Sequence, residues 1–151
     1  MNKIRRKKIV GIFILVGFLF IVDRILKYWA LYGLYHTKIN ILKGLLTFEL
    51  FKNYYIAFNI PLPSFLSIPI IITIITILMV LFVQRIKVYQ GYLEAGLLLM
   101  VVGALSNVYD RLQYGFVIDY LNFYVWPVFN AADVMIGLGA FLIACCLWRH
   151  K

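Results

Sequence analysis

The stretch "IVGIFILVGFLFIVDRILKYWALYG", residues 9–33, is the part of the chain that decides the fold. Its apolar portion, residues 9–30, has the length that a membrane-spanning helix requires, about 20 residues. It is too long for the apolar core of an ordinary signal peptide, and no small-residue cleavage site follows it. We therefore predict a membrane span here and expect the rest of the chain to share the bilayer.

Three further apolar stretches have the same character, at residues 65–83, 91–109 and 131–148. Of the 151 residues, 64% are hydrophobic and only 14% are charged, a balance typical of polytopic membrane proteins and far from that of a soluble domain. The sequence therefore predicts one polytopic membrane domain, residues 1–151, with a mainly α fold of four transmembrane helices.

The net charge of +9 comes largely from basic residues that flank the apolar stretches. Basic residues crowd the N-terminal "MNKIRRKK", and others lie in "QRIK" after the second stretch and in "RHK" after the fourth. The positive-inside rule then predicts that both termini and the 84–90 turn are cytoplasmic. A nucleic-acid-binding protein would instead carry a basic face on a folded surface. We therefore expect membrane lipids and no nucleic acid as partners, and we expect a monomer.

Two connecting segments on the outer side, residues 37–60 and 114–128, carry β-strand patterns. In "LLTFELFKN" the polar Thr47 and Glu49 alternate with the apolar Phe48 and Leu50, and "GFVIDYLNFYVW" is a second extended run, rich in aromatic residues. Tyr and Trp favour the membrane–water interface. We predict a small extracytoplasmic β-sheet that rests on the outer membrane face.

Four Asp residues are expected to approach that outer face. Asp110 closes the third span, Asp133 opens the fourth, and Asp119 lies between them. Asp23 lies about 22 Å along the first span, at about 1.5 Å per residue. Carboxyl groups in so apolar a chain are costly and are usually functional.

Two of these residues repeat one spacing. "NVYD" ends in Asp110 with Asn107 at its start, and "NAAD" ends in Asp133 with Asn130 at its start. Residues three apart share a face of a helix. The two Ala residues inside "NAAD" also leave room for another backbone to come close.

The environments of Asp119 and Asp133 are expected to differ. Asn130 caps the last helix, and the positive end of that helix helps to keep Asp133 ionised. Ile118 and Tyr120 give Asp119 an apolar setting, which raises its pKa. Two carboxyls whose pKa values are pushed apart can divide the acid and base roles, one polarising a carbonyl and the other taking a proton from water. The pair is therefore a hypothesis for an aspartyl-protease dyad.

Structural interpretations of the same residues stay open at this point. An Asp at the start of a helix is commonly a capping residue. Asp110 beside Arg111 is typical of a structural ion pair, and so is Asp23 beside Arg24 and near Lys27.

Other hydrolytic chemistries lack the residues they need. His36 and His150 are the only histidines, so the helical His pair of a zinc protease is missing and a serine protease would lack its base. The adjacent Cys145 and Cys146 do not have metal-ligand spacing; we interpret them as structural, with acylation as an alternative. We expect neither a metal nor another cofactor.

The motifs resemble, in order and over nearly the whole chain, those of a known family, bacterial signal peptidase II, the lipoprotein signal peptidases of aspartyl peptidase family A8. "VDRILK" resembles the first-span Asp motif, and "KNYYIAF" is similar to R-N-x-G-A-A-F. "VGALSNVYDRL" resembles G-G-A-x-G-N-x-x-D-R, "VIDYLNF" is similar to V-V-D-F, and "PVFNAAD" to P-x-F-N-x-A-D. Five motifs in this order are a specific signal.

The resemblance implies an endopeptidase that removes signal peptides from diacylglyceryl-modified prolipoproteins, cutting before the lipidated Cys at the outer face of the bacterial cytoplasmic membrane. It implies that the outer sheet cradles the substrate. Matched motif by motif, it implies a catalytic dyad of Asp119 and Asp133. It also implies substrate-site and supporting residues, namely Asn53, Asn107, Arg111 and Asn130 for the substrate, and Asp23 and Asp110 for the architecture.

Four residues depart from the family motifs. Tyr55, Ile56, Val102 and Ser106 stand where the family has smaller residues, and we expect them to crowd the cleft or to alter helix packing. They keep open the alternative of a divergent paralogue that binds lipoproteins without cutting them. A further alternative is a small transporter whose carboxyls form a proton or cation path.

Overall fold

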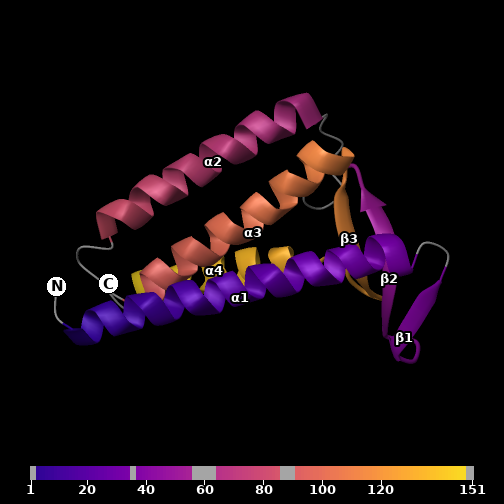
Figure 1. Cartoon of the computed structure of the whole chain (residues 1–151), viewed down its shortest axis with the longest axis horizontal. Helices are drawn as coiled ribbons and strands as arrows, with labels where there is room; N and C mark the ends of the chain where they lie inside the picture. The colour runs from indigo at the N-terminus through magenta and orange to yellow at the C-terminus, as the bar shows by residue number, and fades with distance from the viewer. Residues whose placement is uncertain (1–2, 35–36, 56–63, 86–90, 149–151) are drawn as a thin grey trace.

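The structure, a computed structural model, describes residues 3–34, 37–55, 64–85 and 91–148. Within them the chain forms α1 (Lys3–Gly33), β1 (Lys38–Leu42), β2 (Leu46–Asn53), α2 (Ser64–Arg85), α3 (Tyr92–Tyr114), β3 (Val117–Phe123) and α4 (Ala131–Trp148). The four helices run side by side and the sheet lies across one end of them (Figure 1). By length and composition each helix is able to cross a membrane. The predicted fold class is therefore confirmed.

Helix α3 is the central helix. In its most apolar 18-residue stretch, 61% of the residues are buried, against 11% in α1 and α2 and 22% in α4. It contacts all three other helices, and it runs between α2 and α1 in Figure 1. The outer helices therefore turn large apolar side chains outward, among them Phe18, Ile74 and Phe141. Such surfaces suit a surrounding of lipid tails, which are as apolar as these side chains.

Glycines allow α3 and α4 to pack with their backbones in contact. A Cβ atom on Gly103 would lie 2.6 Å from the carbonyl oxygen of Ala132, and one on Gly96 would lie 2.7 Å from that of Gly139. Real Cβ atoms do not approach oxygen so closely, so this packing requires glycine at both positions. The expected close approach to "NAAD" is therefore observed. It brings Asn107, one turn after Gly103, next to the start of α4.

The sheet is antiparallel, in the order β1–β2–β3. Phe48 of β2 and Tyr120 of β3 are buried against each other, with their ring centroids 5.1 Å apart. An irregularity between Phe48 and Phe51 sets the register so that Phe51 lies opposite Asp119. Because alternate residues of a strand share one face, Asn53 lies on the same face as Asp119.

Gly115 ends α3 and turns the chain into β3. Its φ angle of 80° is left-handed, and its N–H donates to the carbonyl oxygen of Arg111 at 3.0 Å. Glycine adopts this conformation without the steric penalty of a Cβ atom. Helix α3 therefore continues to Tyr114, past the predicted end of the span at residue 109. Asp110 and Arg111 consequently lie inside the helix and not at its end.

The remaining differences from the predicted segments are at their ends. Helix α1 begins at Lys3 and continues to Gly33, so it extends beyond residues 9–30 on both sides. Strands β1 and β2 lie within the predicted segment 37–60, and β3 lies within 114–128. Three residues named in the sequence analysis lie outside the described residues: His36, Ile56 and His150.

Candidate active site

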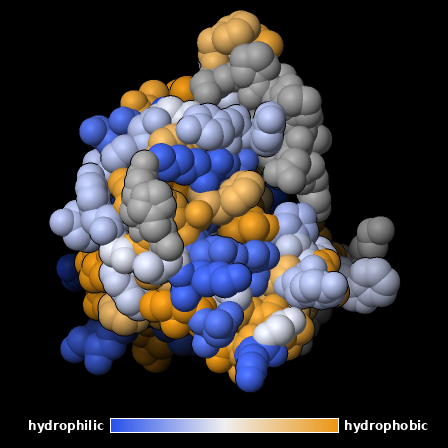
Figure 2. Space-filling model, turned by 90° about the vertical axis from the view of Figure 1, so that its right-hand side faces the viewer, coloured by the Kyte–Doolittle hydropathy of each residue, from blue (hydrophilic) through white to orange (hydrophobic). Residues whose placement is uncertain are grey.

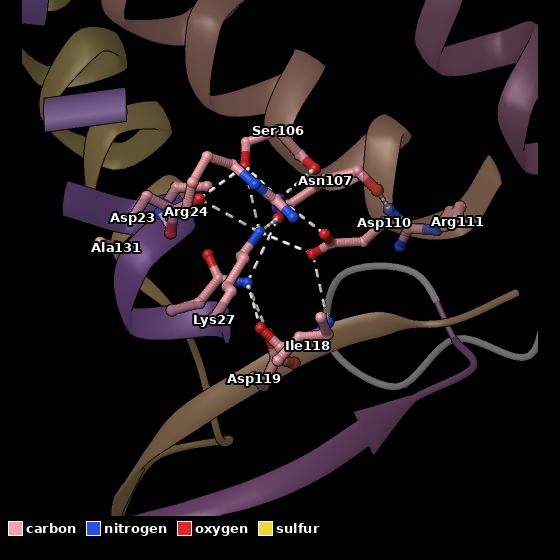
Figure 3. A network of polar contacts seen from close by, with 12 residues as sticks. Asp23, Arg24, Lys27, Ser106, Asn107, Asp110, Arg111, Ile118, Asp119 and Ala131 are labelled. Atoms are coloured by element: carbon pink, nitrogen blue, oxygen red, sulfur yellow. Dashed lines mark hydrogen bonds and ion pairs between the residues drawn. The ribbon is translucent and has the colours of Figure 1, made fainter. Parts of the chain in front are cut away.

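The four Asp residues singled out in the sequence meet at the end of the helix bundle that carries the sheet, and Figure 3 labels three of them, Asp23, Asp110 and Asp119. They come from four elements: Asp23 from α1, Asp110 from α3, Asp119 from β3 and Asp133 from α4. The first three are at most 1% exposed, whereas Asp133 is half-buried. Buried carboxyls depend on hydrogen bonds from the protein because water does not reach them.

Asp133 and Asn130 cap α4 reciprocally. The backbone N–H of Asp133 donates to Asn130 Oδ1 at 3.0 Å, and the N–H of Asn130 donates to Asp133 Oδ2 at 3.2 Å. This is a capping box with Asp in the place usually taken by Glu or Gln. The prediction that Asn130 caps the helix is confirmed. The cap also fixes one oxygen of the Asp133 carboxylate and leaves the other free for a different partner.

Other elements hold the first turn of α4 as well. The N–H of Ala132 donates to Asp23 Oδ1 at 3.1 Å, and the N–H of Ala131 donates to the hydroxyl of Tyr120 at 2.9 Å. These backbone groups would otherwise have no partner inside the helix, and a carboxylate is stabilised at the positive end of a helix. The start of α4, and with it Asp133, is therefore tied to α1 and β3.

Asn107 links α3 to the free oxygen of Asp133. Its Nδ2 donates to Asp133 Oδ1 at 2.8 Å. Its Oδ1 accepts from Lys27 Nζ at 2.8 Å and from Asn130 Nδ2 at 3.2 Å. The amide thus uses both its donor and its acceptor side, which gives it one defined orientation.

Asp119 is held by two amide side chains. Asn53 Nδ2 donates to Asp119 Oδ2 at 2.8 Å, and Asn130 Nδ2 donates to Oδ1 at 2.6 Å. The pKa of Asp119 is raised to about 7, mainly by burial and also by the charge of Asp133, while the two amides and Lys27 oppose the increase. The sequence predicted this direction from the apolar neighbours. Asn130 therefore contacts both carboxyls of the predicted dyad.

Asp110 lies between two cations of α1. Arg24 Nη1 is 2.6 Å from Asp110 Oδ1, and Lys27 Nζ is 2.8 Å from Oδ2. Lys27 Nζ also lies 3.3 Å from Asp23 Oδ2, so the predicted pair of Asp23 and Lys27 is confirmed. The predicted pair of Asp110 and Arg111 is wrong, because neighbouring residues of a helix point to different sides of it.

Arg111 turns toward the end of β2. Its Nη2 donates to the backbone carbonyl of Tyr55 at 3.0 Å, and the N–H of Tyr55 donates to Asn53 Oδ1 at 2.9 Å. Arg111 thereby holds the segment that places Asn53 against Asp119. It also lies close enough to Asp119 and Asp133 to interact with both charges.

A hollow of about 420 Å³ opens beside Asp133. Its other lining residues are apolar: Phe123, Val125, Trp126, Phe129 and Val134. Hydrophilic and hydrophobic residues are interleaved on this end of the molecule, as Figure 2 shows. Of the two predicted catalytic acids, Asp133 is therefore the one that an incoming molecule meets first.

Three of the four residues that depart from the family motifs lie within the described structure. Ser106 is fully buried, and its hydroxyl donates to Asp23 Oδ2 at 2.5 Å and accepts from Arg24 Nη1 at 3.1 Å. Tyr55 is 46% exposed and contributes its backbone N–H and carbonyl to the site. Val102 packs on the apolar core. Ser106 therefore adds hydrogen bonds between α1 and α3 where the family motif has glycine.

Sequence reasoning gave no site role to Lys27 or Tyr120. A signal was present for Lys27, which follows Asp23 by one helical turn in a span otherwise almost without charge. For Tyr120 the pattern indicated only a strand residue. Its hydroxyl reaches the start of α4 only in the folded protein, so no sequence pattern indicated this contact.

The site holds two kinds of carboxyl. Asp23 and Asp110 are neutralised by cations, and Asp119 and Asp133 are held by amide N–H groups. Amides orient a carboxyl without fixing its charge, so the second kind can exchange a proton. In the described part of the chain, no group of three or more His, Cys, Asp or Glu side chains has an arrangement that could hold a metal ion.

Comparison with known proteins gives consistent matches. Residues 15–149 match the family described as signal peptidase (SPase) II. The lipoprotein signal peptidase of Halothermothrix orenii is 31% identical over 141 residues, covering 93% of this chain and 97% of that protein. That of Clostridium novyi is 30% identical over 143 residues, covering 91% and 97%. A bacterial membrane enzyme solved by the in meso method at 2.3 Å resolution has the same fold, with a TM-score of 0.81, 24% identity, and coverage of 93% of this chain and 89% of that one.

Proposed function

Because the chain belongs to the signal peptidase II family, we propose that it is a membrane aspartyl endopeptidase with Asp119 and Asp133 as its catalytic dyad. Its substrates are diacylglyceryl-modified prolipoproteins, and it releases the signal peptide by cutting before the lipidated Cys. Asn53, Asn107, Arg111 and Asn130 line the substrate site in this proposal. The single observation that carries the dyad is the contact of Asn130 with both carboxyls.

The charges of the site support a dyad that shares one proton. Four carboxyls, those of Asp23, Asp110, Asp119 and Asp133, lie among three cationic side chains in the described structure, those of Arg24, Lys27 and Arg111. One proton therefore makes the cluster electrically neutral. Asp23 and Asp110 are ion-paired, which leaves the dyad as the place for that proton. The two carboxyls titrate as a unit, so the proton belongs to the pair.

The reaction follows from a dyad in this state. The ionised carboxyl takes a proton from water, and the water oxygen forms a bond to the scissile carbonyl carbon. The protonated carboxyl donates to the carbonyl oxygen as negative charge develops there. Collapse of the tetrahedral intermediate breaks the C–N bond, and the leaving amine takes a proton from the dyad. The amides of Asn53, Asn107 and Asn130 hold both carboxyls in place, so little reorganisation is needed during the reaction.

The hollow beside Asp133 supports an apolar substrate. Its lining by Phe123, Trp126 and Phe129 suits a peptide that carries an acylated residue at the bond to be cut. The exposed aromatic residues of this region, including Tyr124 at 84% exposure, are of the kind that lies at the membrane–water interface. A lipidated substrate in the outer leaflet would meet the dyad at that level.

The helix ends support one orientation in the membrane. The basic first turns of α1 and Arg85 at the end of α2 lie at the end of the bundle opposite the sheet. The positive-inside rule places that end, with both termini, in the cytoplasm. The sheet and the dyad then face the outside of the bacterial cytoplasmic membrane. In this proposal the protein works as a monomer among membrane lipids, without a metal or cofactor, and Asp23 and Asp110 support its architecture.

The test is cleavage of a diacylglyceryl-modified prolipoprotein by the purified protein in lipid nanodiscs, followed by the size shift of the product on a gel. Asp119→Asn and Asp133→Asn are each expected to lower the rate by about 10²- to 10⁴-fold or more, because each removes a proton-transfer group. A chelator is expected to leave the rate unchanged.

Glu49→Gln is the matched control. Glu49 lies on β2 of the same sheet, where it accepts hydrogen bonds from Asn122 and Thr47 away from the dyad. This variant is expected to cut normally. Full activity in either Asp variant would refute the dyad, and binding of the lipidated substrate without any cleavage by the unmodified protein would favour a binding-only function.

A further inference from the structure

Lys27 makes two hydrogen bonds besides its ion pairs, to Ser106 Oγ at 3.3 Å and to Asn107 Oδ1. Its side chain is 0% exposed, and its Nζ pairs with Asp110 at 2.8 Å and with Asp23 at 3.3 Å. Nζ also donates to Asn107 Oδ1 at 2.8 Å, as short as its contact with Asp110. Figure 3 shows the Lys27 side chain reaching from α1 into the space between α3 and β3. The contact with Asn107 connects Lys27 to the amide that binds Asp133.

The chemistry of an amide makes this contact directional. Asn107 presents an oxygen that only accepts and a nitrogen that only donates. A Lys ammonium only donates, so it binds the oxygen and turns the nitrogen toward Asp133 Oδ1, at 2.8 Å. The reversed amide would bring its NH₂ group against the ammonium and its oxygen against a carboxylate, which leaves donors facing donors and acceptors facing acceptors.

We propose that Lys27 is a positioning residue of the reaction: through Asn107 it fixes the hydrogen bond that orients the Asp133 carboxylate. This rests on the proposed function of Asp133. Lys27 lies behind Asn107, on the side away from Asp133, so it sets the geometry of the reacting carboxyl without touching the substrate. Its loss is therefore expected to lower kcat and to leave KM nearly unchanged.

Arg24 provides a matched control. It lies on the same helix and binds the same carboxylate, with Nη1 2.6 Å from Asp110 Oδ1, and it also donates to the carbonyl and hydroxyl oxygens of Ser106. Arg24 and Lys27 therefore share the structural task of neutralising Asp110. They differ in the pair with Asp23 and in the bond to Asn107, both of which Lys27 makes.

The experiment compares Lys27→Met with Arg24→Gln in nanodiscs, measuring kcat and KM on a lipidated prolipoprotein and the thermal midpoint of each variant. Lys27→Met is expected to lower kcat by about 10- to 100-fold, the scale of a misplaced reacting group, with KM nearly unchanged. Arg24→Gln removes a charge beside the same carboxylate, Asp110, and is expected to lower the thermal midpoint and to lower kcat much less than Lys27→Met does. In the Asn107→Ala background, Lys27→Met is expected to cause little further loss of kcat, because both changes remove the same hydrogen-bonded connection from Lys27 through Asn107 to Asp133.

Equal losses of kcat in the two variants, or additive losses with Asn107→Ala, would overturn the proposal. If Lys27→Met does not fold, Asp23→Asn/Lys27→Met removes one buried charge of each sign and is compared with Asp23→Asn alone. Normal kcat in that double variant would also overturn it.

A readout without substrate separates this proposal from the proposed function. The side-chain amide protons of Asn107, followed by NMR in micelles, are expected to exchange with solvent faster in Lys27→Met and not in Arg24→Gln. Unchanged exchange in Lys27→Met overturns the role of Lys27 even if the protein cuts no substrate. Faster exchange without cleavage by the unmodified protein would support the contact while refuting the proposed function.

Discussion

The two Asn-x-x-Asp motifs have the same spacing and opposite surroundings. In "NVYD" on α3, Asp110 is fully buried between Arg24 and Lys27. In "NAAD" at the start of α4, Asp133 is half-buried, and it accepts hydrogen bonds from the neutral groups of Asn107 and Asn130. The charge of Asp110 is compensated by two cations, whereas the Asp133 carboxyl is oriented by neutral amide groups. The difference teaches that the spacing of the motif does not by itself set the chemistry of each Asp, because the partners from the facing helix differ.

The contrast between Asp110 and Asp133 is tested most strongly by removing each carboxylate in turn. Asp110→Ala leaves Arg24 and Lys27 short of a buried anion and is expected to lower the free energy of unfolding by about 3–5 kcal/mol. Asp133→Ala removes one part of a capping box and is expected to cost about 0.5–2 kcal/mol. Denaturant unfolding in micelles measures both. A larger loss for Asp133→Ala would contradict the division of roles.

The next prediction concerns the close contact between α3 and α4, the helices that carry the two motifs. Gly103→Ala places a Cβ atom 2.6 Å from the Ala132 carbonyl oxygen, so α3 and α4 must move apart, at about 1–3 kcal/mol. The hydrogen bond from Asn107 to Asp133 crosses this contact, so cleavage is expected to fall as well. Gly137→Ala is the control, because nothing lies within 4 Å of its Cβ position. The thermal midpoint and the cleavage rate of both variants test this.

The titration of Asp119 sharpens the comparison. Its pKa of about 7 exceeds the ordinary value of 3.8, so the folded protein binds this proton more tightly than the unfolded chain. The resulting stabilisation is complete below pH 3.8 and is lost as the pH rises through about 7. Asp133→Asn removes a neighbouring negative charge and is expected to move the midpoint below about 7. Carbon-13 NMR of the Asp carboxyls would show this, and a smaller change is expected for Asp110→Asn, whose charge is already paired.

The smallest expected effect concerns the residues that depart from the family motifs. Ser106→Ala removes a hydroxyl that donates to Asp23 and accepts from Arg24, and it is expected to lower the free energy of unfolding by about 1 kcal/mol. Tyr55→Gly keeps both backbone hydrogen bonds of the exposed Tyr55 and is expected to change stability less. Thermal unfolding ranks the two, and a larger loss for Tyr55→Gly would show that its ring matters.

Much of the fold was predictable because its signals are local. The length of each apolar stretch indicated a span, and the alternation around Phe48 indicated a strand. The capping role of Asn130 and the pairing of Asp23 with Lys27 were predictable for the same reason, since both are contacts within one helical turn. The site residues were named from motifs, without their partners.

The sequence by itself determined four membrane-length helices, a small sheet, and four Asp residues near one end of the bundle. The tertiary structure decided which Asp meets a cation and which meets an amide. That choice depends on how α1 is rotated against α3 and how closely Gly103 lets α4 approach, and both are set by contacts between residues far apart in the chain. Adjacency in the sequence suggested Arg111 as the partner of Asp110, whereas the fold supplies Arg24 and Lys27 from α1. Sequence patterns also left unseen the buried Lys27, which reaches from α1 to the amide beside Asp133.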